Sequence, residues 1–211
     1  MGKVSIQMTN DKKRYVIGGC TYARISDIAR AGSNPYLEQW KKRIGEVEAE
    51  RIAREAAKYG DLVHEITMWN DLGKKKKVDR MLINHEFLLS PLLAWQNWVS
   101  KYVRKWLMRE TVVWSARWGC AGKIDGVPII IGDNDPSIID IKTGGLWDTT
   151  GIQLAGYMVV YNEKAKKKAK RRLAISIPRK NPGTLTLKEF TEEKYVEEFK
   201  SKAELFKSMN G

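Results

Sequence analysis

The most informative segment of this 211-residue chain is Ser137-Ile138-Ile139-Asp140-Ile141-Lys142-Thr143-Gly144. Its apolar residues predict a β-strand, in which side chains two positions apart point to the same face. Ile139 and Ile141 therefore share one face, and Asp140 and Lys142 share the other. Burial of a charged pair in a sheet costs free energy unless a partner compensates it. We interpret Asp140 and Lys142 as candidate functional residues; the alternative is a structural ion pair on a half-exposed sheet face.

The neighbouring segments predict helices and further strands around this one. In chain order, the expected elements are a helix at about 90–107, strands at 111–114, 119–127 and 138–142, a helix at 149–163 and a strand at 172–178. Asp148-Thr149-Thr150 supplies a cap for the second of these helices. This order over about residues 90–178 predicts an α/β core with a central mixed β-sheet flanked by helices.

Helices are also expected on both sides of this core. Ser33-Asn34-Pro35 is typical of a helix start, and residues 46–71 carry the apolar stripe of a long amphipathic helix. Gly73 and the run Lys74 to Lys77 are expected to end that helix. We therefore expect a helical N-terminal lobe at about 33–107, a C-terminal helix at about 192–208 and a single domain over residues 1–211.

The net charge of the chain limits the classes of molecule that we expect it to bind. Thirty-eight Lys and Arg against 25 Asp and Glu give a formal net charge of +13, which favours a polyanion, usually nucleic acid. An anionic membrane surface, or a protein that is simply basic, is the alternative. No apolar run approaches the ~20 residues that cross a bilayer, and the N-terminus lacks a secretory apolar region. Cys20 and Cys120 are too few for a disulfide framework. We expect a reduced, cytoplasmic protein, in the host cytoplasm if the chain is viral.

A second acid is expected to meet Asp140. Asp125 lies in the preceding strand, and a turn at Asp133-Asn134-Asp135-Pro136 would bring the two strands together. Two neighbouring carboxylates repel each other unless one takes a proton or a cation lies between them. Mg²⁺ or Mn²⁺ suits such oxygen ligands. A divalent cation beside two acids suits phosphodiester hydrolysis, in which Lys142 can orient the attacking water, help to deprotonate it or stabilise the developing charge.

Four sequence elements occur in a fixed order and carry a resemblance. They are Gly60-Asp61-Leu62-Val63-His64, Gly122-Lys123-Ile124-Asp125, Asp140-Ile141-Lys142-Thr143-Gly144 and Gln153-Leu154-Ala155-Gly156-Tyr157. With them the chain resembles the PD-(D/E)xK nuclease superfamily, and within it exonucleases similar to the nuclease domain of RecB, over about residues 33–178. The resemblance implies a restriction-endonuclease-like core. The size of the chain is closer to stand-alone, phage-type members than to helicase-fused ones.

The resemblance also implies a role for each matched residue. His64, Asp125, Asp140 and the Ile141 carbonyl would bind Mg²⁺ or Mn²⁺, and Lys142 would assist the attacking water. Gln153 and Tyr157, one helical turn apart, would contact the scissile strand beside the metal. Glu110 is an auxiliary ligand candidate. Read without the resemblance, His64 is an ordinary helix histidine, and Gln153 and Tyr157 are an ordinary polar and core pair.

Basic and aromatic side chains supply candidates for contact with DNA. The DNA-binding candidates are Lys74, Lys75, Lys76, Lys77, Lys166, Lys167, Lys168, Lys170, Arg171, Arg172 and Trp147. Basic runs of this kind contact phosphates without reading sequence, although they are also common in solvated loops. Trp147 follows the strand of Asp140 and Lys142 closely enough to stack on an unpaired base.

The acids and the net charge favour a metal-dependent phosphodiesterase that acts on nucleic acid, and the resemblance implies a DNA exonuclease in phage DNA recombination, repair or processing, with a recombination partner protein as a candidate partner. A structure-specific endonuclease on the same site is one alternative. A non-catalytic basic DNA-binding module, whose acidic pair is structural, is the other. The sequence leaves the oligomeric state open.

Overall fold

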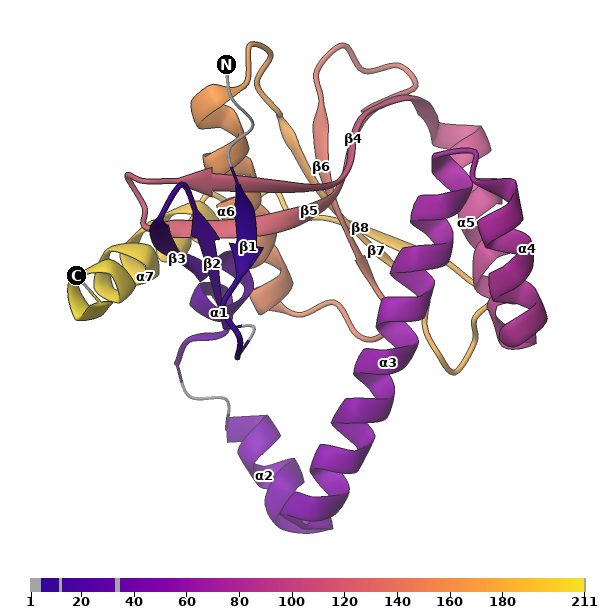
Figure 1. The fold of residues 1–211 in the computed structure, drawn as a ribbon, viewed down its shortest axis with the longest axis horizontal. Helices are drawn as coiled ribbons and strands as arrows, with labels where there is room; N and C mark the ends of the chain where they lie inside the picture. Colours follow the sequence, from indigo (N-terminus) through magenta and orange to yellow (C-terminus); the bar gives the residue numbers. More distant parts are fainter. Residues whose placement is uncertain (1–4, 12, 33–34, 211) are drawn as a thin grey trace.

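A computed structural model describes residues 5–11, 13–32 and 35–210 of the chain (Figure 1). The N-terminal elements are β1 (Ile6–Met8), β2 (Arg14–Ile17), β3 (Cys20–Arg24), α1 (Ile25–Arg30), α2 (Pro35–Ile44), α3 (Glu46–Asp71), α4 (Lys75–Asn84) and the short 3-10 helix η1 (Glu86–Leu88). The elements that follow are α5 (Leu89–Tyr102), β4 (Val103–Ser115), β5 (Cys120–Ile130), β6 (Ser137–Lys142), α6 (Asp148–Lys164), β7 (Arg171–Ser176), β8 (Thr186–Glu189) and α7 (Lys194–Asn210).

The strands form one mixed eight-stranded sheet that branches at β5. The order is β1-β2-β3-β5-β6-β7-β8, and β4 pairs with β5 outside this path. Along one edge β5 is antiparallel to β4. Its other edge is shared by β3, which is parallel to it near Cys120, and by β6, which is antiparallel to it at Gly126. The expected α/β class, with a mixed sheet flanked by helices, is confirmed.

Helices cover both faces of the sheet. On one face, α1, α6 and α7 bury a core that includes Ile138 of β6. On the other face, α3, α4 and α5 pack against Ile139 and Ile141. The prediction that Ile139 and Ile141 share a face is therefore confirmed, and by alternation Asp140 lies on the side of α6.

The N-terminal 30 residues add a part of the sheet that the sequence pattern did not predict. The strands β1, β2 and β3 form an antiparallel meander, and β3 joins it to β5 through the pairs Ala23–Cys120 and Arg24–Ala121. These strands are three to five residues long and partly exposed, so they carry little alternation of their own. Pairing with residues about 100 positions away stabilises them, and such pairing leaves no local signal.

Several predicted boundaries are wrong. The helix expected at 90–107 ends at Tyr102, and Val103 and Trp106 lie in the strand β4, because the β-branched and aromatic residues that follow pair with β5. The helix α3 ends before the lysine run as expected, but Lys75 to Lys77 begin a further helix, α4. The helix expected from Ser33-Asn34-Pro35 begins at Pro35 as described, and Ser33 and Asn34 lie outside the described residues. The predicted C-terminal helix is confirmed as α7.

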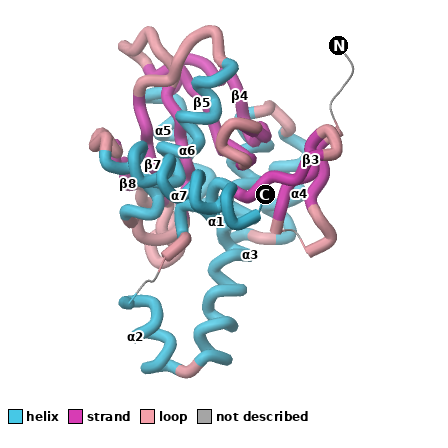
Figure 2. The backbone as a smooth tube through the Cα atoms, turned by 90° about the vertical axis from the view of Figure 1, so that its left-hand side faces the viewer, coloured by secondary structure: helices cyan, strands magenta, loops and turns pink. Residues whose placement is uncertain are grey.

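The helix α2 and the first turns of α3 extend away from the sheet as a helical arm (Figures 1 and 2). The described part of α2 buries no residue, and four of the five buried residues of α3 lie at or after Tyr59. Ion pairs stabilise the exposed half of α3, where Arg51 lies 2.6 Å from Glu48 and 2.5 Å from Glu55. Across the described ranges, no helix combines the length and apolar composition that a membrane span needs.

The packing of α6 makes a testable prediction at Gly156. A Cβ atom there would lie 2.5 Å from the ring of Phe199 in α7 and 2.8 Å from Ile25 in α1. We expect Gly156→Ala to lower the free energy of unfolding by about 1–3 kcal/mol, because overpacking outweighs the better helix propensity of alanine. Urea denaturation measures this change. The control is Gly183→Ala, where a Cβ would meet nothing within 4 Å; an equal loss in both variants would contradict the packing argument.

Candidate metal centre

Asp125 lies where β5 and β6 part. The register between these strands contains the pair Gly126–Ile139, together with an isolated bridge between Ile129 and Pro136. Beyond that pair, the backbone amide of Ile141 donates a 2.6 Å hydrogen bond to the Asp125 carboxylate instead of to a strand carbonyl. Asp125 is 6% exposed and Asp140 is 2% exposed. The expected approach of the two acids across the hairpin is therefore confirmed.

Asp140 lies at the centre of a polar group on the α6 side of the sheet. Lys142 Nζ lies 2.6 Å from its carboxylate, and Gln153 donates a 3.0 Å hydrogen bond to its other oxygen. Gln153 also accepts a 3.3 Å hydrogen bond from Lys142 and lies 3.1 Å from the Tyr157 hydroxyl. Gln153 thus fixes the amine, the acid and the phenol relative to one another.

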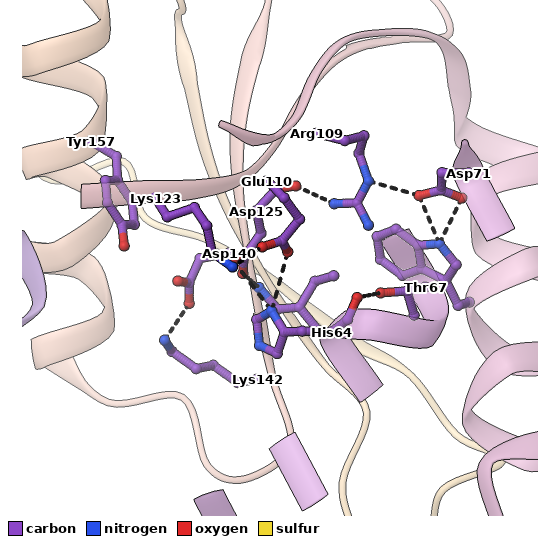
Figure 3. A network of polar contacts seen from close by, with 12 residues as sticks. His64, Thr67, Asp71, Arg109, Glu110, Lys123, Asp125, Asp140, Lys142 and Tyr157 are labelled. Carbon is purple, nitrogen blue, oxygen red and sulfur yellow. Dashed lines mark hydrogen bonds and ion pairs between the residues drawn. The ribbon is translucent and has the colours of Figure 1, made fainter. Parts of the chain in front are cut away.

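His64 approaches the acids from the opposite face. It lies in the buried half of α3, and its Nδ1 is 3.3 Å from Asp125 and 3.7 Å from Glu110 (Figure 3). Glu110 is the only described non-glycine residue with a positive φ, at 47°. For an L-residue such a conformation is strained, and strain of this kind concentrates at functional sites. Lys123 Nζ lies 2.5 Å from the second oxygen of Glu110 and balances its charge.

The group that can hold a metal ion differs from the expected ligand set. His64, Glu110 and Asp125 each offer a ligand atom, and these atoms all lie within 4.8 Å of one another. Asp140, expected as a ligand, directs its carboxylate to Lys142 and Gln153. Ile141, whose carbonyl was the other expected ligand, contacts the site through its amide. Glu110 was predicted only as an auxiliary ligand, because its position depends on a backbone conformation that no local pattern reveals.

The charges within the cluster favour the protonated form of His64. Burial would lower the pKa of His64, but the charges of Asp125 and Glu110 outweigh it and raise this pKa to about 10. Burial also works against ionised Asp125, but the charge of His64 holds the Asp125 pKa below its ordinary value. Burial, with a contribution from Asp125, raises the pKa of Asp140 to about 6, although Lys142 opposes this. The described cluster thus holds a proton where a cation could replace it.

A cleft leads from solvent to these side chains. It has a volume of about 450 Å³ and is lined by Asp61, His64, Glu65, Met68, Glu110, Lys123 and Asp125. On the same helix, a Cβ at Gly60 would lie 3.4 Å from the Thr143 hydroxyl, so α3 approaches the loop after β6 closely. The loop after β6 therefore occupies the space beside Gly60.

The basic runs lie on exposed surface away from the cluster. Lys74 to Lys77 lie at the end of α3 and start of α4, where Lys77 Nζ lies 3.5 Å from the centre of the Trp69 ring. Lys166, Lys167, Lys168 and Lys170 precede β7. In the parallel register of β6 and β7, Arg171 faces Ser137 and Lys142 faces Ser176, so this run lies at the far end of the strands from Lys142. Their contact with DNA stays a prediction.

Two residues of the second run have other partners. Arg172 is 4% exposed and donates hydrogen bonds to the carbonyl groups of Phe190, Thr191 and Glu192, so its prediction as a DNA contact is wrong. A guanidinium in a run of surface lysines gave no sign that it bonds to the carbonyl groups that follow β8. Arg171 is half-buried and pairs with Asp133 at 2.7 Å and with Glu189 at 2.8 Å. Trp147 is 71% exposed at the start of α6, where a stacking role is sterically open.

The raised pKa of His64 predicts how stability depends on pH when no divalent cation is bound. A histidine whose folded pKa lies above its unfolded value of about 6.5 stabilises the fold below pH 6.5, and this contribution is lost as the pH rises through about 10. We therefore expect the free energy of unfolding to fall between about pH 7 and about pH 10, and His64→Gln to flatten this fall. Urea denaturation across this range measures it.

The second histidine of the chain supplies the control. His85→Gln should leave the slope unchanged, since His85 lies outside the cluster. Equal slopes in wild type and His64→Gln would show that His64 does not titrate as its surroundings indicate.

Comparisons with known proteins add little to this geometry. No protein-family model matches the chain, and no curated protein sequence matches it. Among solved structures, the crystal structure of SSO0001 aligns with 86% of this chain and 75% of its own length, at 16% identity and a TM-score of 0.39. A likeness of this size carries no argument about fold family or function, so the site must be interpreted from its own chemistry.

Proposed function

We propose that this chain is a divalent-metal-dependent deoxyribonuclease that hydrolyses phosphodiester bonds, and within that class an exonuclease. The observation that carries the proposal is the convergence of four separate segments on one buried site. His64 comes from α3, Asp125 from β5, Asp140 and Lys142 from β6, and Gln153 with Tyr157 from α6. These are the segments that carry the resemblance to the PD-(D/E)xK superfamily.

The donor set fits Mg²⁺ or Mn²⁺. Carboxylate oxygens suit both ions, and the imidazole of His64 adds a ligand that transition metals such as Mn²⁺ accept well. The three ligand atoms lie close enough to surround one ion. Asp125 and Asp140 are buried acids at neighbouring strand positions, and a cation would relieve the repulsion between them. When bound, the ion would lower the pKa of a coordinated water and neutralise charge on the phosphate.

The residues beside the ligands supply the remaining chemistry. The amine of Lys142 is held by Asp140 and Gln153 rather than free in solvent, so it can orient a water molecule or stabilise negative charge at a fixed point. Gln153 and Tyr157 lie on the same face of α6, next to Asp140, where they could contact the strand that is cleaved. Fixed polar groups of this kind need little rearrangement during reaction, which is what makes them effective.

The rest of the chain agrees with a DNA substrate and with the proposed fold. A net charge of +13 attracts a polyanion, and exposed lysines at the start of α4 and before β7 can contact phosphates without reading bases. The order α5-β4-β5-β6-α6-β7 is the element order that a restriction-endonuclease-like core would have. The proposal for this core rests on that order and on the site, since the sheet also carries β1 to β3 and β8.

Substitution of the cluster tests the proposal. With linear DNA and Mg²⁺, we expect Asp125→Asn to abolish digestion and Lys142→Ala to slow it by about a hundredfold or more. The rate is measured from DNA labelled separately at the 5′ and 3′ ends. Asp79→Asn, which removes an exposed acid of α4, is the matched control and should keep the wild-type rate. Undiminished digestion by purified Asp125→Asn would refute the mechanism.

Two further measurements separate the alternatives. An exonuclease leaves circular single-stranded DNA intact, whereas a structure-specific endonuclease opens it. A non-catalytic DNA-binding module binds DNA equally with and without Mg²⁺ and hydrolyses none at any metal concentration.

A further inference from the structure

A second, fully buried contact links α3 to β4 beside the candidate metal centre. Arg109 Nε lies 2.9 Å from the Asp71 carboxylate, and their side chains are 2% and 0% exposed. Asp71 also accepts hydrogen bonds of 3.0 and 3.1 Å from the indole nitrogen of Trp95. The Arg109 guanidinium carbon lies 5.3 Å from the centre of the Trp95 ring and 4.7 Å from the centre of the Trp106 ring, within the range of cation–π contacts.

The other side of this guanidinium reaches the metal centre itself. Arg109 Nη1 donates a hydrogen bond to the backbone carbonyl of Asp125. The side chain therefore bridges the end of α3 to the backbone of a candidate metal ligand. His64 lies two turns before Asp71 on the same helix, so α3 and β4 are joined twice, by His64 with Glu110 and by Asp71 with Arg109.

Arg109 also borders the strained residue of the cluster. Glu110 follows it directly and has a φ of 47°. The Thr111 hydroxyl donates a 3.0 Å hydrogen bond to the Arg109 carbonyl and so closes the backbone over Glu110. A left-handed residue in a strand persists only where its surroundings fix it on both sides. Here the anchored side chain of Arg109 and the hydroxyl of Thr111 do so.

We propose that Arg109, anchored by Asp71, is a positioning residue that sets Asp125 and Glu110 at the spacing a divalent cation needs. This inference rests on the proposed function, because it assigns a role at the same site. A planar guanidinium can hold a carboxylate on one edge and a carbonyl on another while it also contacts indole rings, as Arg109 does with Trp95 and Trp106. A lysine keeps the charge beside Asp71 but lacks this fork, so Arg109→Lys separates charge balance from positioning.

Binding of Mn²⁺ to the 211-residue chain, followed by electron paramagnetic resonance without DNA, tests the role. We expect Arg109→Met and Arg109→Lys to raise the dissociation constant for Mn²⁺ by about 10- to 100-fold, as loss of a ligand's supporting partner does. Asp71→Asn should weaken binding as well. If Asp71 acts only through Arg109, adding Asp71→Asn to Arg109→Met should change the affinity no further.

A stability control separates positioning from folding. Leu92→Ala opens a cavity in α5, where Leu92 is 3% exposed, and lowers the urea midpoint without removing a charged or hydrogen-bonding group of this network. It should leave the Mn²⁺ affinity within about twofold of wild type. Wild-type affinity in both Arg109 variants, or an equal loss in Leu92→Ala, would overturn the inference. If wild type itself did not bind Mn²⁺, the proposed metal-dependent function would be refuted. If wild type bound Mn²⁺ but did not hydrolyse DNA, the proposed nuclease activity would be refuted, and the Mn²⁺ affinities of the variants would still test the role of Arg109.

Discussion

The candidate centre depends on the hydrogen bond between the Asp125 carboxylate and the Ile141 amide. In an ordinary antiparallel ladder this amide would bond to a carbonyl of the neighbouring strand. Here β5 pairs with β3 at one end and with β6 at the other, so the strands part beside Asp125. A buried amide must still find an acceptor. The Asp125 carboxylate is this acceptor, and it therefore lies inside the sheet next to the strand of Asp140.

An acid in this position creates a charge problem that the surrounding residues solve. Each buried carboxylate has a cationic neighbour: His64 for Asp125, Lys142 for Asp140 and Lys123 for Glu110. Every one of these neighbours is itself partly accessible, whereas the acids are not. The acids therefore form the fixed part of the site. The cationic groups are the part that a ligand can displace, and a metal ion that replaced the proton of His64 would release it to solvent.

The sequence predicted the part of the site that depends on the local alternation of apolar and polar residues. Apolar residues at 139 and 141 placed Asp140 and Lys142 on one face, and the turn before Pro136 brought Asp125 to Asp140. What it missed depends on distant partners. Trp106 continued a helical spacing but belongs to β4, and Arg109 and Arg172 resemble surface cations although both are buried against acceptors remote in the chain. Glu110 was underrated because its reach depends on a left-handed backbone.

The helix α3 shows why the buried links at its C-terminal half matter. It is one helix of 26 residues that begins in the exposed arm and ends at Asp71. A force on the arm would therefore turn His64 as well, unless the second half of the helix were held. Val63, Ile66 and Thr67 are buried against the sheet, and the Asp71–Arg109 pair fixes the last turn to β4. A hydrophobic face is not directional and alone permits some sliding, but a buried ion pair at the helix end, whose guanidinium also contacts two indoles, restricts register and rotation. The arm can thus be exposed while the imidazole stays in place.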